Sequence, residues 1–141
     1  MSEDFYCDEA LSGRTPVEVV METDDGSLGQ RGAFWHIEKL VTRKDEKGKV
    51  WGKEEAVDRR TALRMFTRWA AEYVLREDVL GSLEPGKWAD LVVIDRDFLS
   101  IPNEHINLIK VLLTVVGGKL VHTEARFAQA ESLPQVGYRP N

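Results

Sequence analysis

The sequence predicts an α+β fold in which a helical segment is followed by a small group of strands. Between residues 58 and 78 the apolar side chains recur every three or four positions, which is the period of one face of a helix. From residue 90 the pattern changes to short, continuous apolar runs rich in β-branched side chains, which is typical of strands. The pair Gly117-Gly118 lies between two such runs and indicates a hairpin.

The composition favours one soluble domain. The chain has 141 residues, of which 43% are hydrophobic and 30% charged, so it can form a moderate core and differs from a disordered chain. The net charge of −5 and the absence of a basic stripe argue against nucleic-acid binding. No secretory signal and no apolar run of about 20 residues is present, and Cys7 is the only cysteine. We expect a cytoplasmic protein without nucleic-acid or membrane partners.

The first third of the chain contains two predicted elements. Residues 16–22, PVEVVME, alternate enough to predict a short strand, which a polar, glycine-rich loop follows. Residues 33–43 have apolar side chains at three- and four-residue spacings, which predicts a short amphipathic helix. Residues 44–55 are highly charged and are interpreted as an exposed turn.

The clearest helix is predicted to begin at Asp58, which is a favourable N-cap residue. We expect it to continue to residue 78, with Gly81 as a stop signal. The apolar face of this helix is interpreted as core packing rather than as a ligand site. It consists of Ala62, Leu63, Phe66, Trp69, Ala70, Tyr73 and Val74.

Three strands are predicted in the second half. Residues 90–95, DLVVID, are continuously apolar in the middle, so we expect both faces of this strand to be covered. Residues 108–116 form the second strand, and the Gly-Gly turn joins it to the third at 119–122. Residues 123–141 show no clear period and are expected to form a loose tail with one helical turn.

Few residues have the spacing of a catalytic or metal site. His36, His105 and His122 form no zinc-binding motif and are interpreted as surface or structural residues. The pair Asp24-Asp25 differs, because it lies in a glycine-containing loop directly after the predicted strand 16–22. Carboxylates at such strand ends carry the chemistry of α/β barrel enzymes. Asp-Asp-Gly is also a favourable turn sequence, and the turn interpretation is preferred on the residues alone.

Two longer motifs resemble a known family. The segment LGSLEPGKWADLVVIDRDFLSIP, followed by IKVLLTVVGGKLVH, is similar to the C-terminal end of the amidohydrolase superfamily, and most of all to its amidohydrolase 3 group. A helix of the TALRMFTRWAAEYV type precedes these motifs in that family. The resemblance covers roughly residues 56–122.

The resemblance implies a composite architecture. Residues 1–80 would be the C-terminal remnant of a (β/α)₈ barrel, with its last strand, a loop and helices. Residues 81–122 would form half of the accessory β-sandwich, and 123–141 the C-terminal tail. The EPGKWAD turn would lead from the last barrel helix into the sandwich. A (β/α)₈ barrel takes about 250 residues, so this chain has room for only part of one.

The resemblance also implies a function. Members of the family are metal-dependent hydrolases of C–N bonds, and most of their metal ligands would lie upstream of this sequence. Asp24 matches the aspartate of the last barrel strand, which binds the divalent, zinc-like metal and accepts a proton from the attacking water; Asp25 is the alternative. We expect no cofactor on this chain alone and hence an inactive fragment of the enzyme. The alternatives are a non-catalytic, self-associating relic and a subunit that completes a barrel in trans.

The strands themselves predict self-association. The runs in residues 90–122 are rich in Leu, Ile and Val, and the resemblance implies that segments absent from this chain normally cover them. Exposed aliphatic surface beside unpaired strand edges favours pairing with another chain. We therefore expect a homo-oligomer formed through residues 90–122.

Overall fold

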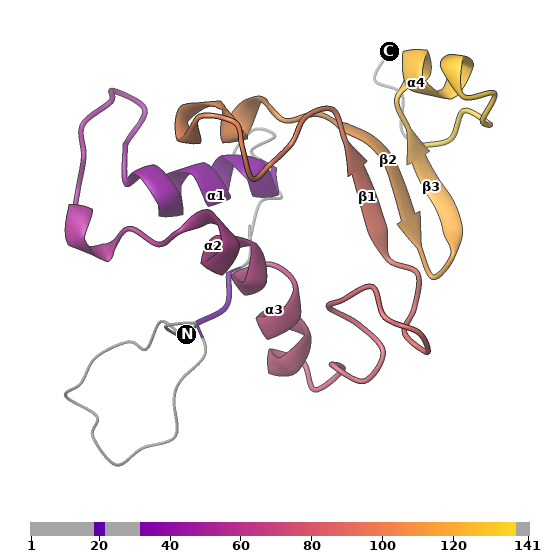
Figure 1. The fold of residues 1–141 in the computed structure, drawn as a ribbon, viewed down its shortest axis with the longest axis horizontal. Helices are drawn as coiled ribbons and strands as arrows, with labels where there is room; N and C mark the ends of the chain where they lie inside the picture. Colours follow the sequence, from indigo (N-terminus) through magenta and orange to yellow (C-terminus); the bar gives the residue numbers. More distant parts are fainter. Residues whose placement is uncertain (1–18, 22–31, 138–141) are drawn as a thin grey trace.

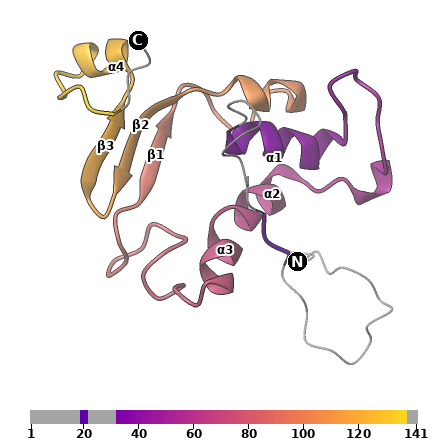
Figure 2. The same ribbon diagram turned by 180° about the vertical axis from the view of Figure 1, so that it is seen from behind.

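A computed structural model of the chain describes residues 19–21 and 32–137. It has two parts, a group of short helices and a three-stranded antiparallel sheet, which lie side by side in both views (Figures 1 and 2). The α+β prediction is confirmed. None of the helices formed by the described residues is long and apolar enough to cross a membrane.

The first helix, α1 (Ala33–Thr42), agrees with the predicted helix 33–43. It ends where Arg43 adopts a left-handed conformation with φ of 54° and donates its N–H to the carbonyl of Lys39. A charged turn follows, as predicted, closed by an antiparallel bridge between Lys44 and Val50. The short 3₁₀ helix η2 (Lys53–Glu55) then leads towards the next helix.

The long helix predicted from Asp58 is present but broken in two. Asp58 caps α2 (Arg59–Met65) as expected, since its carboxylate accepts the N–H groups of residues 60 and 61. The chain leaves the α conformation at Thr67, and α3 (Arg68–Tyr73) begins after it. The Thr67 hydroxyl donates to the carbonyl of Leu63 at 2.8 Å, and such a side-chain bond to the preceding turn bends helices. The prediction of one continuous helix to residue 78 was therefore wrong.

Gly81 is not the stop signal of this helix. The helix ends eight residues earlier at Tyr73, and Leu75 takes the left-handed position of the cap with φ of 55°. Gly81 instead packs directly on α3, because a Cβ atom there would lie 2.7 Å from the Cβ of Ala71. The segment after α3 thus returns to the helix at a position that only glycine fits.

The core lies within the helical part. Ile37 of α1, Met65 of α2 and Ile106 are at most 3% exposed, and Phe98 packs with them. The predicted apolar face of the long helix contributes Ala62, Phe66 and Trp69 to this core or its margin. Its later members do not join the core, since Tyr73 and Val74 are exposed; the break at Thr67 turns α3 out of line with α2.

The sheet has the order β1-β2-β3, with β1 (Leu91–Ile94), β2 (Val111–Val116) and β3 (Lys119–Thr123). Gly117 and Gly118 both have positive φ, 55° and 75°, which is the requirement of a two-residue type I′ turn, so the hairpin prediction is confirmed.

The start of the second strand was predicted three residues too early. Residues 103–108 form the 3₁₀ helix η3 (Asn103–Leu108), and β2 begins only at Val111. The apolar residues in this stretch serve the helical core, because Ile106 and Ile109 are both buried in it. The stretch 108–116, predicted as one strand, therefore contains the end of η3 and the whole of β2.

The tail is more ordered than predicted. The expected helical turn is α4 (Ala125–Ala130), capped by the carboxylate of Glu124, which accepts the N–H of Phe127. The segment after α4 returns to the end of β3, where the Thr123 hydroxyl donates to the carbonyl of Pro134 and accepts the N–H of Val136, each at 3.0 Å. Thr123 is buried by these contacts.

Candidate functional site

The predicted site residues Asp24 and Asp25 lie outside the described residues. The structure describes the segment just before them, residues 19–21, of which Val19 and Met21 pack against the helical core. The N–H of Met21 donates to the carbonyl of Met65 at 3.3 Å. Residues 19–21 are not in a strand, and the rest of the predicted strand 16–22 also falls outside the described part.

The three histidines lie on separate elements. His36 is on α1, where its Nδ1 lies 3.2 Å from the carbonyl of Gly32 and its ring is edge-on to Trp35. His105 is in η3, and His122 is in β3 opposite Thr114. Across residues 19–21 and 32–137 no three His, Cys, Asp or Glu side chains come together to hold a metal ion. His105 is exposed, and His36 and His122 are partly buried.

The EPGKWAD turn is joined to the Gly-Gly hairpin. The carboxylate of Asp90 accepts the N–H of Gly117 at 2.6 Å, and the carbonyl of Ala89 accepts the N–H of Gly118 at 3.1 Å. Within the turn, Lys87 donates to the hydroxyl of Ser82 at 2.8 Å. The two motifs that carry the family resemblance are thus structural partners, and Asp90 connects them.

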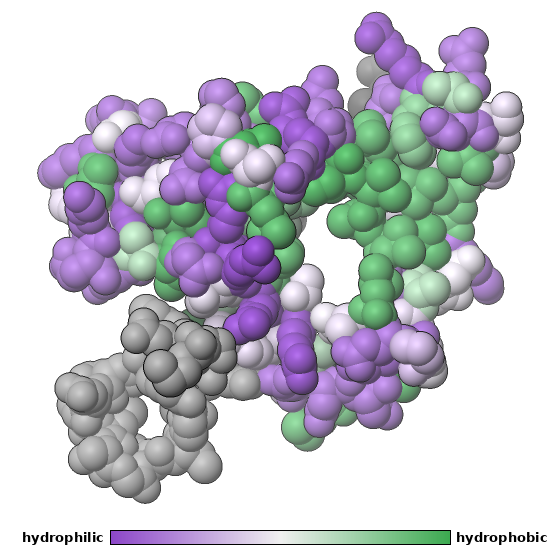
Figure 3. Space-filling view, in the orientation of Figure 1, coloured by the Kyte–Doolittle hydropathy of each residue, from purple (hydrophilic) through white to green (hydrophobic). Residues whose placement is uncertain are grey.

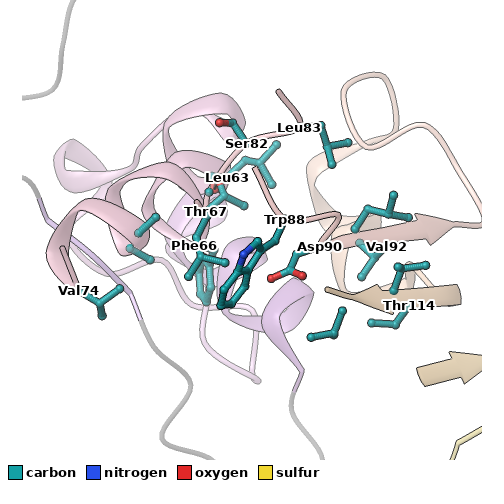
Figure 4. Close-up of a pocket in the computed structure, with 17 residues that line it drawn as sticks. Leu63, Phe66, Thr67, Val74, Ser82, Leu83, Trp88, Asp90, Val92 and Thr114 are labelled. Atoms are coloured by element: carbon teal, nitrogen blue, oxygen red, sulfur yellow. Dashed lines mark hydrogen bonds between the residues drawn. The ribbon is translucent and has the colours of Figure 1, made fainter. Parts of the chain in front are cut away.

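A cavity of about 700 Å³ lies between the helices and the sheet. Figure 3 shows the corresponding hollow between the two parts, and Figure 4 shows the side chains around it. Its wall is mostly apolar. Leu63 lies on α2, and Phe66 and Val74 directly follow α2 and α3. Trp88 precedes β1 and Val92 lies on it. This volume lies in the range of small-molecule sites, roughly 300–1,000 Å³.

The cavity has few groups for chemistry. Its polar side chains are Thr67, Ser82, Asp90 and Thr114, and the Asp90 carboxylate is already bonded to a backbone N–H. The guanidinium of Arg76 lies 5.3 Å from the centre of the Trp88 ring, near the cavity wall. Among the described residues, no histidine, cysteine or lysine lines it. The described lining therefore favours the binding of apolar groups.

Two carboxyl groups whose pKa is lowered, those of Asp58 and Asp95, also have structural hydrogen-bond partners. Burial raises the pKa of Asp58, but hydrogen bonds from Thr61 and Arg60 outweigh it and hold that pKa below its usual value. The hydrogen bond from Arg96 and the backbone N–H of Lys110 lower the pKa of Asp95 to about 2. Both groups stay ionised at neutral pH, whereas a general acid or base works best with a pKa near the operating pH.

Sequence reasoning missed two features. Glu38 on α1 is 6% exposed, and its carboxylate accepts the backbone N–H of Asn107 at 3.1 Å and bonds Lys39 at 3.2 Å. It connects α1 to η3, which no sequence pattern indicates.

The cavity was missed too, because residues from four separated segments form it.

Comparison with known proteins defines the family. The model of the amidohydrolase family matches residues 10–122, which include both motifs described above, so the chain belongs to this family. Over 71 residues the chain is 37% identical to the 5-methylthioadenosine/S-adenosylhomocysteine deaminase of Teredinibacter turnerae. That match covers 50% of this chain and 16% of the deaminase. No solved structure matches the chain.

Proposed function

We propose that this chain is the C-terminal portion of a metal-dependent amidohydrolase that hydrolyses C–N bonds. The observation that carries the proposal is the family match over residues 10–122, together with a relative named as a deaminase. Deamination replaces a C–N bond by a C–O bond with water as the nucleophile, which is a hydrolysis of this kind. The relative directs attention to aminopurine nucleosides as the first substrates to test.

The composite architecture belongs to the same proposal. The helical part would be the end of a (β/α)₈ barrel, and β1, β2 and β3 would be half of the accessory sandwich. The apolar cavity and the half-exposed sheet support this assignment, because both are surfaces that a further layer of chain would cover. Asp24 is proposed as the carboxylate that binds the metal and accepts a proton from the attacking water, with Asp25 as the alternative.

The isolated chain is proposed to be inactive. Metal sites of this kind use three or four protein ligands, and the described residues bring no such group together. Elemental analysis of the purified chain should find no stoichiometric zinc, and an ammonia-release assay with 5-methylthioadenosine should find no turnover. Stoichiometric zinc or turnover by this chain would contradict the proposed inactivity.

A chimaera tests the role of Asp24. Residues 10–122 would replace the equivalent part of the Teredinibacter turnerae deaminase, and we expect the chimaera to bind metal and to release ammonia from 5-methylthioadenosine. Asp24→Asn should lower the rate at least a hundredfold, since general-base catalysis is worth about 10²–10⁴. Asp25→Asn is the matched control and should retain activity. The reverse result would transfer the role to Asp25, and full activity in both variants would exclude this pair.

A second candidate function is a non-catalytic module that associates with itself through residues 90–122. The observation in its favour is the exposure of the strands, because Val92, Val93, Val116 and Val121 are 36–51% exposed. This contradicts the prediction that both faces of the strand 90–95 are covered, at least by the residues that the structure describes. Light scattering tests the proposal, since a mass near 16.0 kDa at all concentrations would exclude it.

A further inference from the structure

We propose that a pocket between α2 and the segment after β1 binds a small organic phosphate monoester through three arginines. The pocket has a volume of about 480 Å³, which lies in the range of small-molecule sites. Arg60 and Arg64 of α2 and Arg96 after β1 line it and are here called the arginine triad. This inference goes beyond the proposed hydrolysis of C–N bonds and does not depend on it.

Two members of the arginine triad lack a partner. Arg60 and Arg64 lie four residues apart on α2, so their side chains extend from the same face of the helix. Among residues 19–21 and 32–137, neither guanidinium takes part in a hydrogen bond or an ion pair. Like charges at this spacing repel each other and weaken a helix. A bound anion would offset this repulsion.

Arg96 is held in a fixed orientation. Its Nε and Nη2 donate to the two carboxylate oxygens of Asp95, at 3.1 and 2.9 Å. Asp95 is fixed in turn, because its Oδ1 accepts the backbone N–H of Lys110 at 2.9 Å. A guanidinium carries five N–H donors, and these two bonds leave the other three for a ligand. Arg96 can therefore bind an anion without losing its contact with Asp95.

The neighbouring carboxylates do not satisfy the arginine triad. Asp97 lines the pocket, but its carboxylate accepts the backbone N–H of Leu99 at 2.9 Å and forms no ion pair within the described part of the chain. Asp58 attracts Arg64, but its carboxylate is occupied by the N–H and the hydroxyl of Thr61. The lining thus contains three guanidinium groups and one carboxylate, and its charge favours an anion.

The rest of the lining is apolar. It consists of Leu63, Ile94, Phe98 and Leu99. Leu63 and Leu99 are 38% and 46% exposed, so a ligand that packs against them would remove aliphatic surface from water. The pocket therefore combines an anion site with an apolar wall, and it fits an anion that carries an apolar group.

A phosphate monoester fits the arginine triad better than a carboxylate does. A phosphate monoester carries a charge of about −1.5 to −2 at neutral pH and three strong acceptor oxygens. A carboxylate carries one charge and two oxygens, which a single guanidinium can satisfy in a bidentate pair. Arginine is also well suited to bidentate bonding of phosphate. Phenyl phosphate is a compact probe of this class.

A second basic pocket, beside α1, is a weaker candidate. Lys39, Arg43 and Lys44 line it, and each of them already pairs with a glutamate. The carboxylates of Asp45 and Glu46 line it as well. An anion would have to displace or oppose these carboxylates there, whereas Arg60 and Arg64 have no such partner to lose.

Calorimetric titration of the chain at constant ionic strength tests the class of ligand. Phenyl phosphate carries both recognised groups, whereas inorganic phosphate and phenol carry one each. Phenyl phosphate should bind at least about fivefold more tightly than either of them. Leu99→Ala should weaken the binding of phenyl phosphate but not of inorganic phosphate, because it removes part of the apolar wall alone.

Substitution of single arginines tests the site. Arg60→Gln and Arg64→Gln should each raise the dissociation constant of phenyl phosphate at least about fivefold, since each removes a charge-assisted hydrogen bond. Arg126→Gln removes the same charge from α4, which lies on the far side of the sheet from α2 in both views (Figures 1 and 2). This matched control should change the dissociation constant by no more than about twofold. All three arginines are exposed, and circular dichroism would confirm that the variants are folded.

Three results would overturn the inference. Absence of phenyl phosphate binding would exclude the pocket as a phosphate site. Equal losses in Arg64→Gln and Arg126→Gln would show a general attraction of anions to the chain rather than binding by the arginine triad. Equal affinities for phenyl phosphate and inorganic phosphate would exclude the organic monoester as the ligand. None of these results bears on the assignment to a C–N hydrolase, which the chimaera tests separately.

Discussion

The helical part and the sheet contain similar aliphatic side chains but bury them to different degrees. In the helical part Ile37, Met65 and Ile106 are at most 3% exposed. In the sheet no aliphatic side chain of the three strands is buried, and Val92 and Val116 are about half exposed. The difference shows that the helical part forms its own core from segments far apart in the sequence, such as α1 and η3, whereas the described sheet has one layer and needs a second to form a core.

This contrast sharpens the meaning of the family match. The family match spans residues 10–122 and so includes both the helical part and the sheet, of which only the sheet leaves much aliphatic surface accessible. Four substitutions test this contrast and the contacts that stabilise each part, beginning with the largest expected loss of stability.

Ile106→Ala should destabilise the protein most. Ile106 has no exposed surface, and truncation of a buried isoleucine costs about 2–5 kcal/mol of unfolding free energy. Val93→Ala is the counterpart in the sheet and should cost less than about 1 kcal/mol, because the side chain is already 36% exposed. Urea denaturation measures both changes. Equal losses would mean that the sheet is as well packed as the helical core.

Gly81→Ala tests the contact between the turn and α3. A Cβ atom at Gly81 would lie 2.7 Å from the Cβ of Ala71, and φ there is 86°, so steric overlap adds to backbone strain. We expect a loss of about 2–4 kcal/mol in urea denaturation. Gly86→Ala separates the two causes, since φ is 93° but no atom lies within 4 Å. A similar loss in both variants would show that only the backbone conformation matters.

Asp58→Ala should cost about 1 kcal/mol, the usual effect of removing an N-cap. The variant leaves the N–H groups of Arg60 and Thr61 without their acceptor. Asp58→Asn keeps an acceptor oxygen in place and should be nearly neutral at neutral pH. Thermal denaturation of the unsubstituted protein and both variants would show whether the cap or the charge contributes to stability. A large loss of thermal stability in Asp58→Asn would favour the charge.

The contact between β1 and β2 should weaken in acid. Arg96 and the N–H of Lys110 hold the pKa of Asp95 at about 2, below the value of about 3.9 in an unfolded chain. A lowered pKa stabilises the fold above the unfolded value, and this contribution is lost as the pH falls from about 4 towards 2. Asp95→Asn should flatten the acid dependence of stability in this window. An unchanged dependence, measured by urea denaturation at several pH values, would show that Asp95 is not its source.

Features determined by neighbouring residues could be predicted from the sequence. The cap at Asp58 and the turn at Gly117-Gly118 follow from the chemistry of two to four residues, and both are present. The helix 33–43 was predicted for the same reason, because its pattern repeats within one short segment. The break at Thr67 could not be predicted, since it depends on which acceptor the hydroxyl selects.

Features that depend on distant segments were not predictable. The apolar stretch before β2 was interpreted as strand, whereas burial of Ile106 against α1 and α2 makes it part of the helical core. The cavity requires the placement of the sheet beside α2 and α3, which no local pattern encodes. The candidate site residue Asp24 remains a prediction from resemblance, because it lies outside the described residues.

The unequal spacing of the strands has a consequence for synthesis of the chain. Sixteen residues separate β1 from β2, whereas only the two glycines separate β2 from β3. At about 5–20 residues per second, the ribosome needs roughly 1–4 s to add the 22 residues from the end of β1 to the end of β2. A hairpin closes in about 1–10 μs. β1 therefore emerges seconds before its partner strand, and its valines remain without that partner for far longer than a hairpin takes to close.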